Sequence, residues 1–182
     1  MAGCSDMKPR EDTREERAQQ GLVRTNEVDE RFSITKDVPR ENPDIDLPAT
    51  SLPDEWLSFK VRNLGVHRFA IAPDSVTQGS DGIVRYTLLV RTAGGVDNIT
   101  HEGMRCATKT WKLYAIGRDT GEWSRLPDPA WRPITLASLN AARFTLSKDY
   151  ICVGDGVRSY DAKTIAARIR ASNEGRLYIM VR

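Results

Sequence analysis

Few residues in this chain have the types and spacing that catalysis or metal binding requires. His101 and Glu102 are adjacent and would suit proton transfer, but neighbouring residues on a strand point to opposite faces. Asp155 and Asp161 flank Gly156, and a turn followed by a helix cap explains both carboxylates more simply than a cation site does. An enzyme of the hydrolase type, using carboxylates near Glu102 or Asp155, is therefore the alternative to a non-enzymatic protein.

The sequence contains no motif for binding nucleotides or for presenting a nucleophile. Its two histidines are too few for a histidine-based metal centre, and its net charge of +2 is too small to indicate nucleic acid binding. We therefore expect no cofactor, no metal ion and no nucleic acid partner.

The first of three cysteines suggests where the protein works. Ala2-Gly3-Cys4-Ser5 is similar to the cleavage box of bacterial lipoproteins, in which the cysteine becomes the lipid-carrying first residue. A lipid on Cys4 would hold the protein on a membrane surface outside the cytosol. Because Ser5 rather than Asp follows the cysteine, we expect the inner leaflet of the outer membrane, with the rest of the chain in the periplasm. The alternative is an ordinary cytoplasmic N-terminus with an incidental cysteine.

Cys106 and Cys152 leave two interpretations open. A disulfide between them would close a loop with a sequence separation of 152 − 106 = 46 residues, worth about 4 kcal/mol in the chain-entropy model. Two buried free thiols in a reducing compartment are equally compatible with the residues. Neither cysteine lies in a Cys-x-x-Cys motif, so zinc binding and thioredoxin-like chemistry are not indicated.

Basic and aromatic residues form the candidate binding surface. Exposed strand positions with positive charge would gather on one face of a sheet and attract anionic partners, although a solvated strand face explains them as well. Two tryptophans between turns would mark a binding surface if exposed and cap the core if buried. The candidate residues are Arg85, Arg91, Asn98, Arg105, Lys109, Trp123 and Trp131, with Lys112 on the same predicted face.

The elements that must position these residues follow from hydrophobic periodicity. Alternation predicts strands over residues 57–61, 67–71, 84–91 and 109–116, a polar edge-like strand over 98–105, and a central closing strand over 177–181. Asp161 caps a predicted helix with the apolar stripe Ala162, Ile165, Ala166 and Ile169, and residues 138–147 favour a weaker helix. The expected fold is α+β, a mainly antiparallel sheet with one or two packed helices.

Composition divides the chain near residue 47. Residues 1–47 hold 8 basic and 12 acidic residues, a net charge of 8 − 12 = −4, and the remainder holds 19 and 13, a net charge of +6. The N-terminal part has apolar residues only singly, so it lacks the surface to bury that folding requires. We therefore predict a lipoprotein N-terminus and flexible tether over residues 1–47 and a folded domain over 48–182.

One block of the sequence resembles a known family. Residues 82–106, GIVRYTLLVRTAGGVDNITHEGMRC, together with Trp111–Ala115, Trp131–Ile134 and Asp149–Cys152, are similar to the CNP-like family, named for a conserved neisserial protein. The resemblance covers about residues 50–155. Members of that family occur in Gram-negative bacteria and tend to be exported or lipoprotein-like, and the family carries no assigned reaction. The resemblance implies an envelope location and a Cys106–Cys152 disulfide, which an oxidising compartment permits.

These observations predict a non-enzymatic cell-envelope lipoprotein. Its tethered domain would bind an envelope protein or a cell-wall glycan, and a lipid on Cys4 would attach it to the membrane. The periplasmic hydrolase described above is the second hypothesis, and a cytoplasmic regulator is the third.

Overall fold

A computed structural model describes residues 38–61, 66–137, 140–154, 156–172 and 177–178. The chain separates into two compact units, Met1–Lys36 and Asp37–Arg182, and all described residues belong to the second. Cys4 and Asp155 lie outside the described residues. None of the described helices is both long and apolar enough to cross a bilayer.

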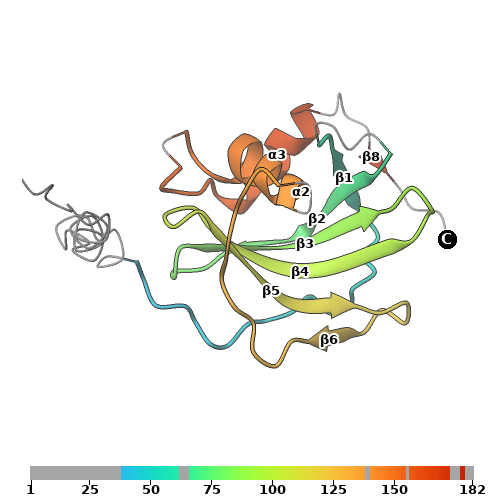
Figure 1. The fold of residues 1–182 in the computed structure, drawn as a ribbon, viewed down its shortest axis with the longest axis horizontal. Helices are drawn as coiled ribbons and strands as arrows, with labels where there is room; N and C mark the ends of the chain where they lie inside the picture. The colour runs from blue at the N-terminus through green and yellow to red at the C-terminus, as the bar shows by residue number, and fades with distance from the viewer. Residues whose placement is uncertain (1–37, 62–65, 138–139, 155, 173–176, 179–182) are drawn as a thin grey trace, which may run out of the picture. The chain divides into compact units, whose positions relative to one another are not determined.

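The second unit is built on one antiparallel sheet of eight strands (Figure 1). The strands are β1 (Trp56–Phe59), β2 (Arg68–Gln78), β3 (Ile83–Arg91), β4 (Asp97–Arg105), β5 (Thr110–Gly117), β6 (Trp123–Arg125), β7 (Arg132–Pro133) and β8 (Leu177–Tyr178). Their spatial order is β6-β5-β4-β3-β2-β1-β8, and β7 pairs with β5. Strands β1 to β6 therefore form a meander, in which each strand pairs with its neighbour in the sequence.

Strand β3 shows how the sequence divides the two faces of the sheet. Val84, Tyr86 and Leu88 are fully buried in the main hydrophobic core, and the alternate residues Arg85 and Thr87 point to the other face. A second, smaller apolar cluster lies on that other face, formed by Trp56, Ala70, Ala72, Leu89 and Ile99. The sheet is thus covered on both sides.

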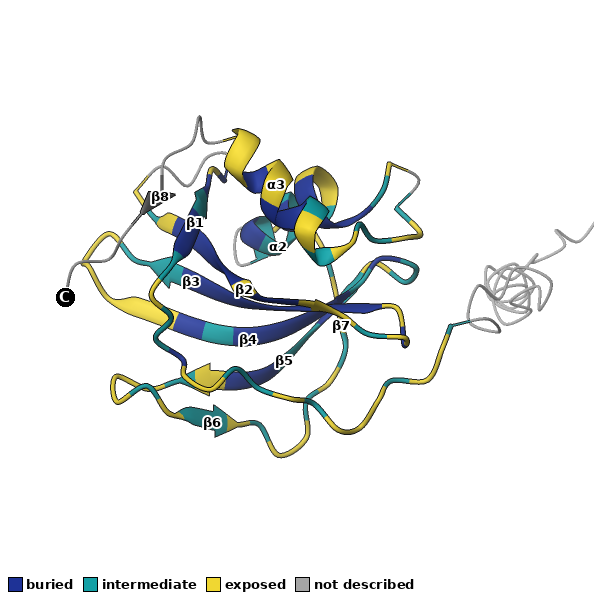
Figure 2. Ribbon diagram, turned by 180° about the vertical axis from the view of Figure 1, so that it is seen from behind, coloured by how far each residue is buried: buried dark blue, intermediate teal, exposed yellow. Residues whose placement is uncertain are grey.

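Helices cover the face that carries the main core. Helix α2 (Ala141–Thr145) runs directly into a π-helical segment, η4 (Leu146–Ile151), and α3 (Ala162–Ser172) packs beside β1 and β2. Ile165, Ala166 and Ile169 form the buried stripe of α3, and its outer side is exposed (Figure 2). The Asp161 carboxylate caps this helix by accepting the Thr164 N–H at 3.0 Å. The predicted α+β class, with its antiparallel sheet and packed helices, is confirmed.

An extended segment covers part of the opposite face. We call residues 38–52 the strap; they form no helix or strand and lead into β1. Leu52 packs against the smaller apolar cluster, and the buried Ser51 donates its N–H to the Gly121 carbonyl at 2.8 Å. Residues 38–47, predicted as part of a free tether, therefore belong to a segment that contacts the folded unit.

Two predicted strands have different places in the sheet. The strand predicted as a polar edge is β4, which lies between β3 and β5. Its polar residues His101 and Glu102 are buried, with partners from β3 and α2. The closing strand, predicted to be central, is the edge strand β8 and pairs only with β1 among the described residues. Residues 179–181 of that prediction lie outside the described residues.

Candidate functional site

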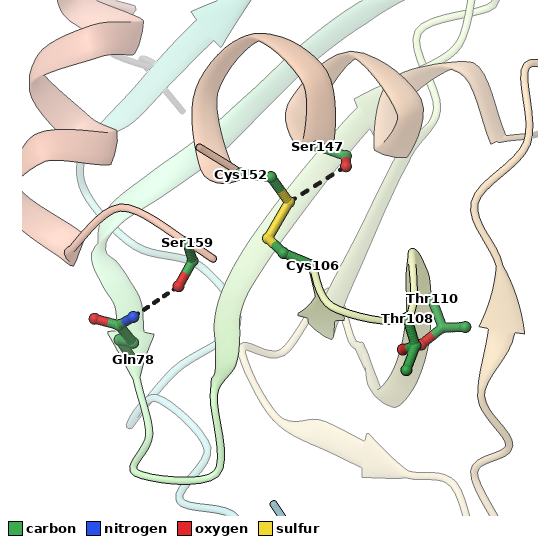
Figure 3. The surroundings of a disulfide bond; sticks show 7 residues. All are labelled: Gln78, Cys106, Thr108, Thr110, Ser147, Cys152 and Ser159. Atoms are coloured by element: carbon green, nitrogen blue, oxygen red, sulfur yellow. Dashed lines mark hydrogen bonds between the residues drawn. A yellow bond between two sulfur atoms is a disulfide. The ribbon is translucent and has the colours of Figure 1, made fainter. Parts of the chain in front are cut away.

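The two domain cysteines form a disulfide (Figure 3). Cys106 directly follows β4 and Cys152 directly follows η4, with 5.7 Å between their Cα atoms. Both residues are buried in the main core, and the Ser147 hydroxyl lies 3.4 Å from the Cys152 sulfur. The disulfide therefore attaches the helical layer to the sheet.

Glu102, the candidate catalytic carboxylate, is held in a buried network on the helical face. It is fully buried, and Arg143 of α2 contacts both of its carboxylate oxygens. The Tyr86 and Thr100 hydroxyls donate to the same carboxylate at 3.2 and 2.8 Å. The Arg143 guanidinium also lies 3.8 Å from the centroid of the Trp111 ring. A carboxylate with these partners connects α2 to the sheet.

His101 points to the opposite face from Glu102, as the strand alternation predicts. Its Nδ1 lies 3.2 Å from the Thr87 hydroxyl, and the edge of Trp123 packs 5.8 Å from its ring centroid. Burial, with the charges of Arg85 and Arg125, lowers the pKa of His101 to about 4. The residue is thus neutral near pH 7, and its adjacency to Glu102 creates no catalytic pair.

An irregularity in β5 creates the most distinctive polar site, on the face under the strap. His101 pairs with Ala115 and Glu102 with Leu113, so Tyr114 is an extra residue on β5. A bulge of this kind changes the direction of a side chain. Gly103 provides the space on the neighbouring strand, because a Cβ there would lie 2.6 Å from the Tyr114 hydroxyl.

Three side chains converge on a carboxylate that the strap supplies. Glu41 accepts hydrogen bonds from Lys112 Nζ at 2.8 Å, from the Tyr114 hydroxyl at 2.8 Å and from Trp131 Nε1 at 3.0 Å. The Arg105 guanidinium lies 4.8 Å from the centroid of the Trp131 ring. We call Arg105, Lys112, Tyr114 and Trp131 the carboxylate site.

The electrostatics of this site favour an ionised carboxylate. Burial raises the pKa of Glu41, but the hydrogen bonds from Lys112, Tyr114 and Trp131 outweigh it, so the pKa lies below its usual value. Burial and the Glu41 charge raise the pKa of Tyr114, so its hydroxyl stays protonated and donates. The site is therefore built to bind a negative charge.

A second carboxylate fixes the strap one residue further along. Asp81 accepts the Asn42 N–H at 3.0 Å and the Arg85 guanidinium at 2.7 Å. Burial raises the pKa of Asp81, but the bonds from Arg85, Asn42 and Ile83 outweigh it, so this pKa also lies below its usual value. Arg85 is consequently a buried ion-pair partner and not an open basic contact.

The structure brings together only part of the predicted binding surface. Arg105 and Trp131 meet at the carboxylate site, and Arg85 lies next to it, 5.8 Å from the Tyr114 ring. Trp123 is further along the strap and donates to the Pro48 carbonyl at 2.9 Å. Trp123 and Trp131 are both half-buried. They are therefore neither fully exposed, as a binding surface would require, nor fully buried as caps of the core.

Three predicted residues lie elsewhere. Arg91 pairs with Asp97 at 2.6 Å where β3 turns into β4, and the exposed Asn98 donates to Val90 at 3.4 Å. Lys109 is exposed in the β4–β5 turn with a φ of 52°. The basic residues predicted to share one face are therefore separated: some lie at the ends of strands and in turns, and others lie under the strap.

Sequence reasoning missed Glu41, Asp81 and Tyr114. Glu41 lies in a charged, proline-containing stretch with no apolar period, so composition placed it in the tether. Alternation from Trp111 places Tyr114 on the same face as Lys112, but it gives no sign that the two side chains meet a carboxylate there. The one available signal was that Glu41 is surrounded by Pro39 and Pro43, which favour an extended chain suited to lying along a surface.

The described residues contain no group of three or more side chains that would hold a metal ion. No curated protein and no solved structure gives a significant match to the chain. The CNP1-like family matches residues 36–170, most of the sequence, including the strap, the carboxylate site and both bonded cysteines. The chain belongs to the CNP1-like family.

Proposed function

We propose that this protein is a cell-envelope lipoprotein whose folded unit is a non-enzymatic binding module for an anionic envelope component. In this proposal a lipid on Cys4 holds it at the inner leaflet of the outer membrane, with the folded unit in the periplasm. Residues preceding the strap would connect the lipid to the fold.

The observation that carries the binding role is the carboxylate site. Lys112, Tyr114 and Trp131 donate to one carboxylate within 3.0 Å, and Arg105 adds a second positive charge over the indole. Such a set of donors recognises a negative group through charge-assisted hydrogen bonds.

Two further observations support the envelope location. The Cys106–Cys152 disulfide is of the kind that persists in oxidising compartments such as the periplasm. Ala2-Gly3-Cys4-Ser5 matches the pattern of a lipid-carrying cysteine. The hydrolase alternative loses support at Glu102, whose carboxylate is buried and bonded to Arg143, Tyr86 and Thr100.

Mass spectrometry of the native protein, isolated from the membrane fraction of its own cells, tests the location. We expect a mature N-terminus at Cys4 carrying lipid, and a disulfide-linked peptide pair containing Cys106 and Cys152. A free Cys4 thiol within an intact N-terminus would exclude the anchor, whatever the folded unit binds.

The binding role has its own test. The purified protein and its Lys112→Met variant are each used to capture partners from an envelope extract after chemical crosslinking. A partner enriched by the wild-type protein and lost from the variant supports the role. Equal enrichment by both proteins would contradict it.

A further inference from the structure

The strap contacts the sheet in a regular way that goes beyond its one carboxylate. Four strap residues exchange main-chain hydrogen bonds with side chains of the folded unit. These residues are Pro39 with Arg105 at 3.3 Å, Asn42 with Asp81 at 3.0 Å, Ile45 with Arg125 at 3.1 Å and Pro48 with Trp123 at 2.9 Å. Each is three residues from the next.

A period of three residues is characteristic of the polyproline II helix. That helix has three residues per turn and no internal hydrogen bonds, so its backbone groups are free to bond a neighbouring surface. The strap sequence from residue 38 to residue 48, VPRENPDIDLP, contains prolines at 39, 43 and 48. Proline-containing segments commonly bind to surfaces lined by aromatic residues, and here Trp123 and Trp131 each donate an indole N–H to the strap.

We propose that this face is a binding site for extended, acidic, proline-containing peptide segments, occupied in this structure by the protein's own residues 38–48. The carboxylate site selects a glutamate, and the main-chain contacts select an extended backbone. A segment of the same chemistry from a partner protein replaces the strap. This inference rests on the proposed binding role and names its ligand class.

The fold permits the exchange because Ser51 attaches the strap to the folded unit separately from the contacts of residues 38–48. Ser51 is fully buried, and its N–H and hydroxyl bond the Gly121 and Arg118 carbonyls at 2.8 and 3.2 Å. Residues 38–48 are half-buried or exposed. The N-terminal part can therefore leave the sheet while Ser51 keeps β1 in place.

The folded unit leaves positive charge for such a ligand. Arg105, Lys112 and Arg125 contact the strap. Lys112 forms an ion pair with Glu41 of the strap, whereas the contacts of Arg105 and Arg125 are to main-chain carbonyls. Because the strap is part of the chain, it competes at an effective concentration on the order of millimolar. An external peptide is therefore expected to bind the wild-type protein weakly and a variant with a weakened strap strongly.

Fluorescence anisotropy with a labelled peptide of the sequence VPRENPDIDLP tests the proposal on the full chain. Glu41→Gln removes the charge that the strap places in the site and leaves the site itself intact. We expect this variant to bind the peptide at least about tenfold more tightly than the wild type does, because charge-assisted hydrogen bonds are lost from the competing strap. The matched control is Asp46→Asn, which removes an exposed strap carboxylate and should bind as the wild type does.

A second pair of variants shows whether the site itself is responsible. Adding Lys112→Met to Glu41→Gln should abolish peptide binding, whereas adding Lys148→Met, at an exposed lysine on η4, should not. The peptide with glutamine in place of its glutamate should bind Glu41→Gln at least about tenfold more weakly. Circular dichroism of each variant confirms that the fold is retained.

Three results would overturn the proposal. They are equal peptide affinity of the wild type and Glu41→Gln, equal affinity for the glutamate and glutamine peptides, and formation of a Glu41→Gln dimer that takes up no peptide. The dimer would show that the segment from a second copy occupies the face. The peptide measurement uses purified protein, so a negative result excludes only the peptide ligand. The lipid anchor is tested separately by mass spectrometry, and the binding of a non-peptide anion is tested by the capture experiment.

Discussion

Glu41 and Glu102 lie on opposite faces of the sheet, and their surroundings give them different roles. Glu102 is fully buried and holds α2 through Arg143, so its partners come from elements of the core. Glu41 is partly exposed and comes from the strap, so its partners would remain if it left. Glu102 therefore belongs to the core of the fold, whereas Glu41 occupies the carboxylate site on which the proposed binding role rests.

The Glu102–Arg143 pair gives the first prediction. Arg143→Met leaves the Glu102 carboxylate buried without its cation, and we expect the free energy of unfolding to fall by about 3–5 kcal/mol. Urea unfolding followed by circular dichroism measures this. The matched control is Arg91→Met, whose ion pair with Asp97 is about one-third exposed on both sides and is expected to cost less than about 1 kcal/mol. Equal losses in the two variants would contradict a structural role for Glu102.

His101 gives a pH dependence of stability. The folded protein holds its pKa at about 4, against 6.5 for the unperturbed residue, so the unfolded chain binds a proton first as the pH falls. Stability is therefore lost progressively below about pH 6.5, by about 2 kcal/mol at pH 5. His101→Gln should reduce this loss, as measured by urea unfolding at pH 7 and pH 5. His67→Gln, at the other histidine, is the control, and an unchanged pH dependence in His101→Gln would contradict the assignment.

At the scale of elements, alternation located most of the sheet, most clearly where one face of a strand lies in the main core, as in β1, β2 and β3. Val84, Tyr86 and Leu88 define β3 without ambiguity. Residues 98–105 were also correctly predicted as a strand, but the predicted edge position of β4 was wrong, since His101 and Glu102 are polar and yet buried. Their partners come from β3 and α2, and the strand's own sequence carries no trace of them. Arg105, Lys112 and Trp131 were predicted as binding candidates, but their meeting around Glu41 was not, because the site combines the strap, two strands and the connection after β6.

The disulfide gives a prediction about how elements are connected. It joins the end of β4 to the end of η4 across the main core. We expect Cys106→Ser combined with Cys152→Ser to lower the free energy of unfolding by about 4 kcal/mol. Thermal unfolding of the double variant measures the loss. Reduction of the wild-type protein under native conditions should give the same loss, and an unchanged midpoint in both cases would show that the bond contributes little.

At the scale of the whole molecule, the strap changes where the folded part begins. Composition divided the chain at residue 47, but contacts of Glu41 and Asn42 with the sheet place the limit earlier, in agreement with a family match from residue 36. Composition missed the contacts of residues 38–47 because these are polar contacts, which leave no hydrophobic pattern in the sequence. Residues 1–37 of the predicted tether lie outside the described residues.

Truncation tests this limit. A chain that begins at residue 37 should unfold at the same urea concentration as the full chain. A chain that begins at residue 48 loses Glu41 and Asn42 and leaves Asp81 and Lys112 without those partners. We expect a loss of about 2 kcal/mol or more, because hydrogen bonds to charged groups are broken. Equal midpoints for the two truncated chains would show that the strap adds no stability.

The separate attachment of Ser51 has a consequence for the distance that the chain can span. While Glu41 and Asn42 are bound, the chain leaves the folded unit near residue 38; if only Ser51 holds, it leaves near residue 50. Residues 38–50 fully extended span about 45 Å. In a lipid-anchored protein, exchange of the strap for a partner segment would thus lengthen the connection to the membrane, and the folded unit would search a wider zone of the periplasm once bound than before.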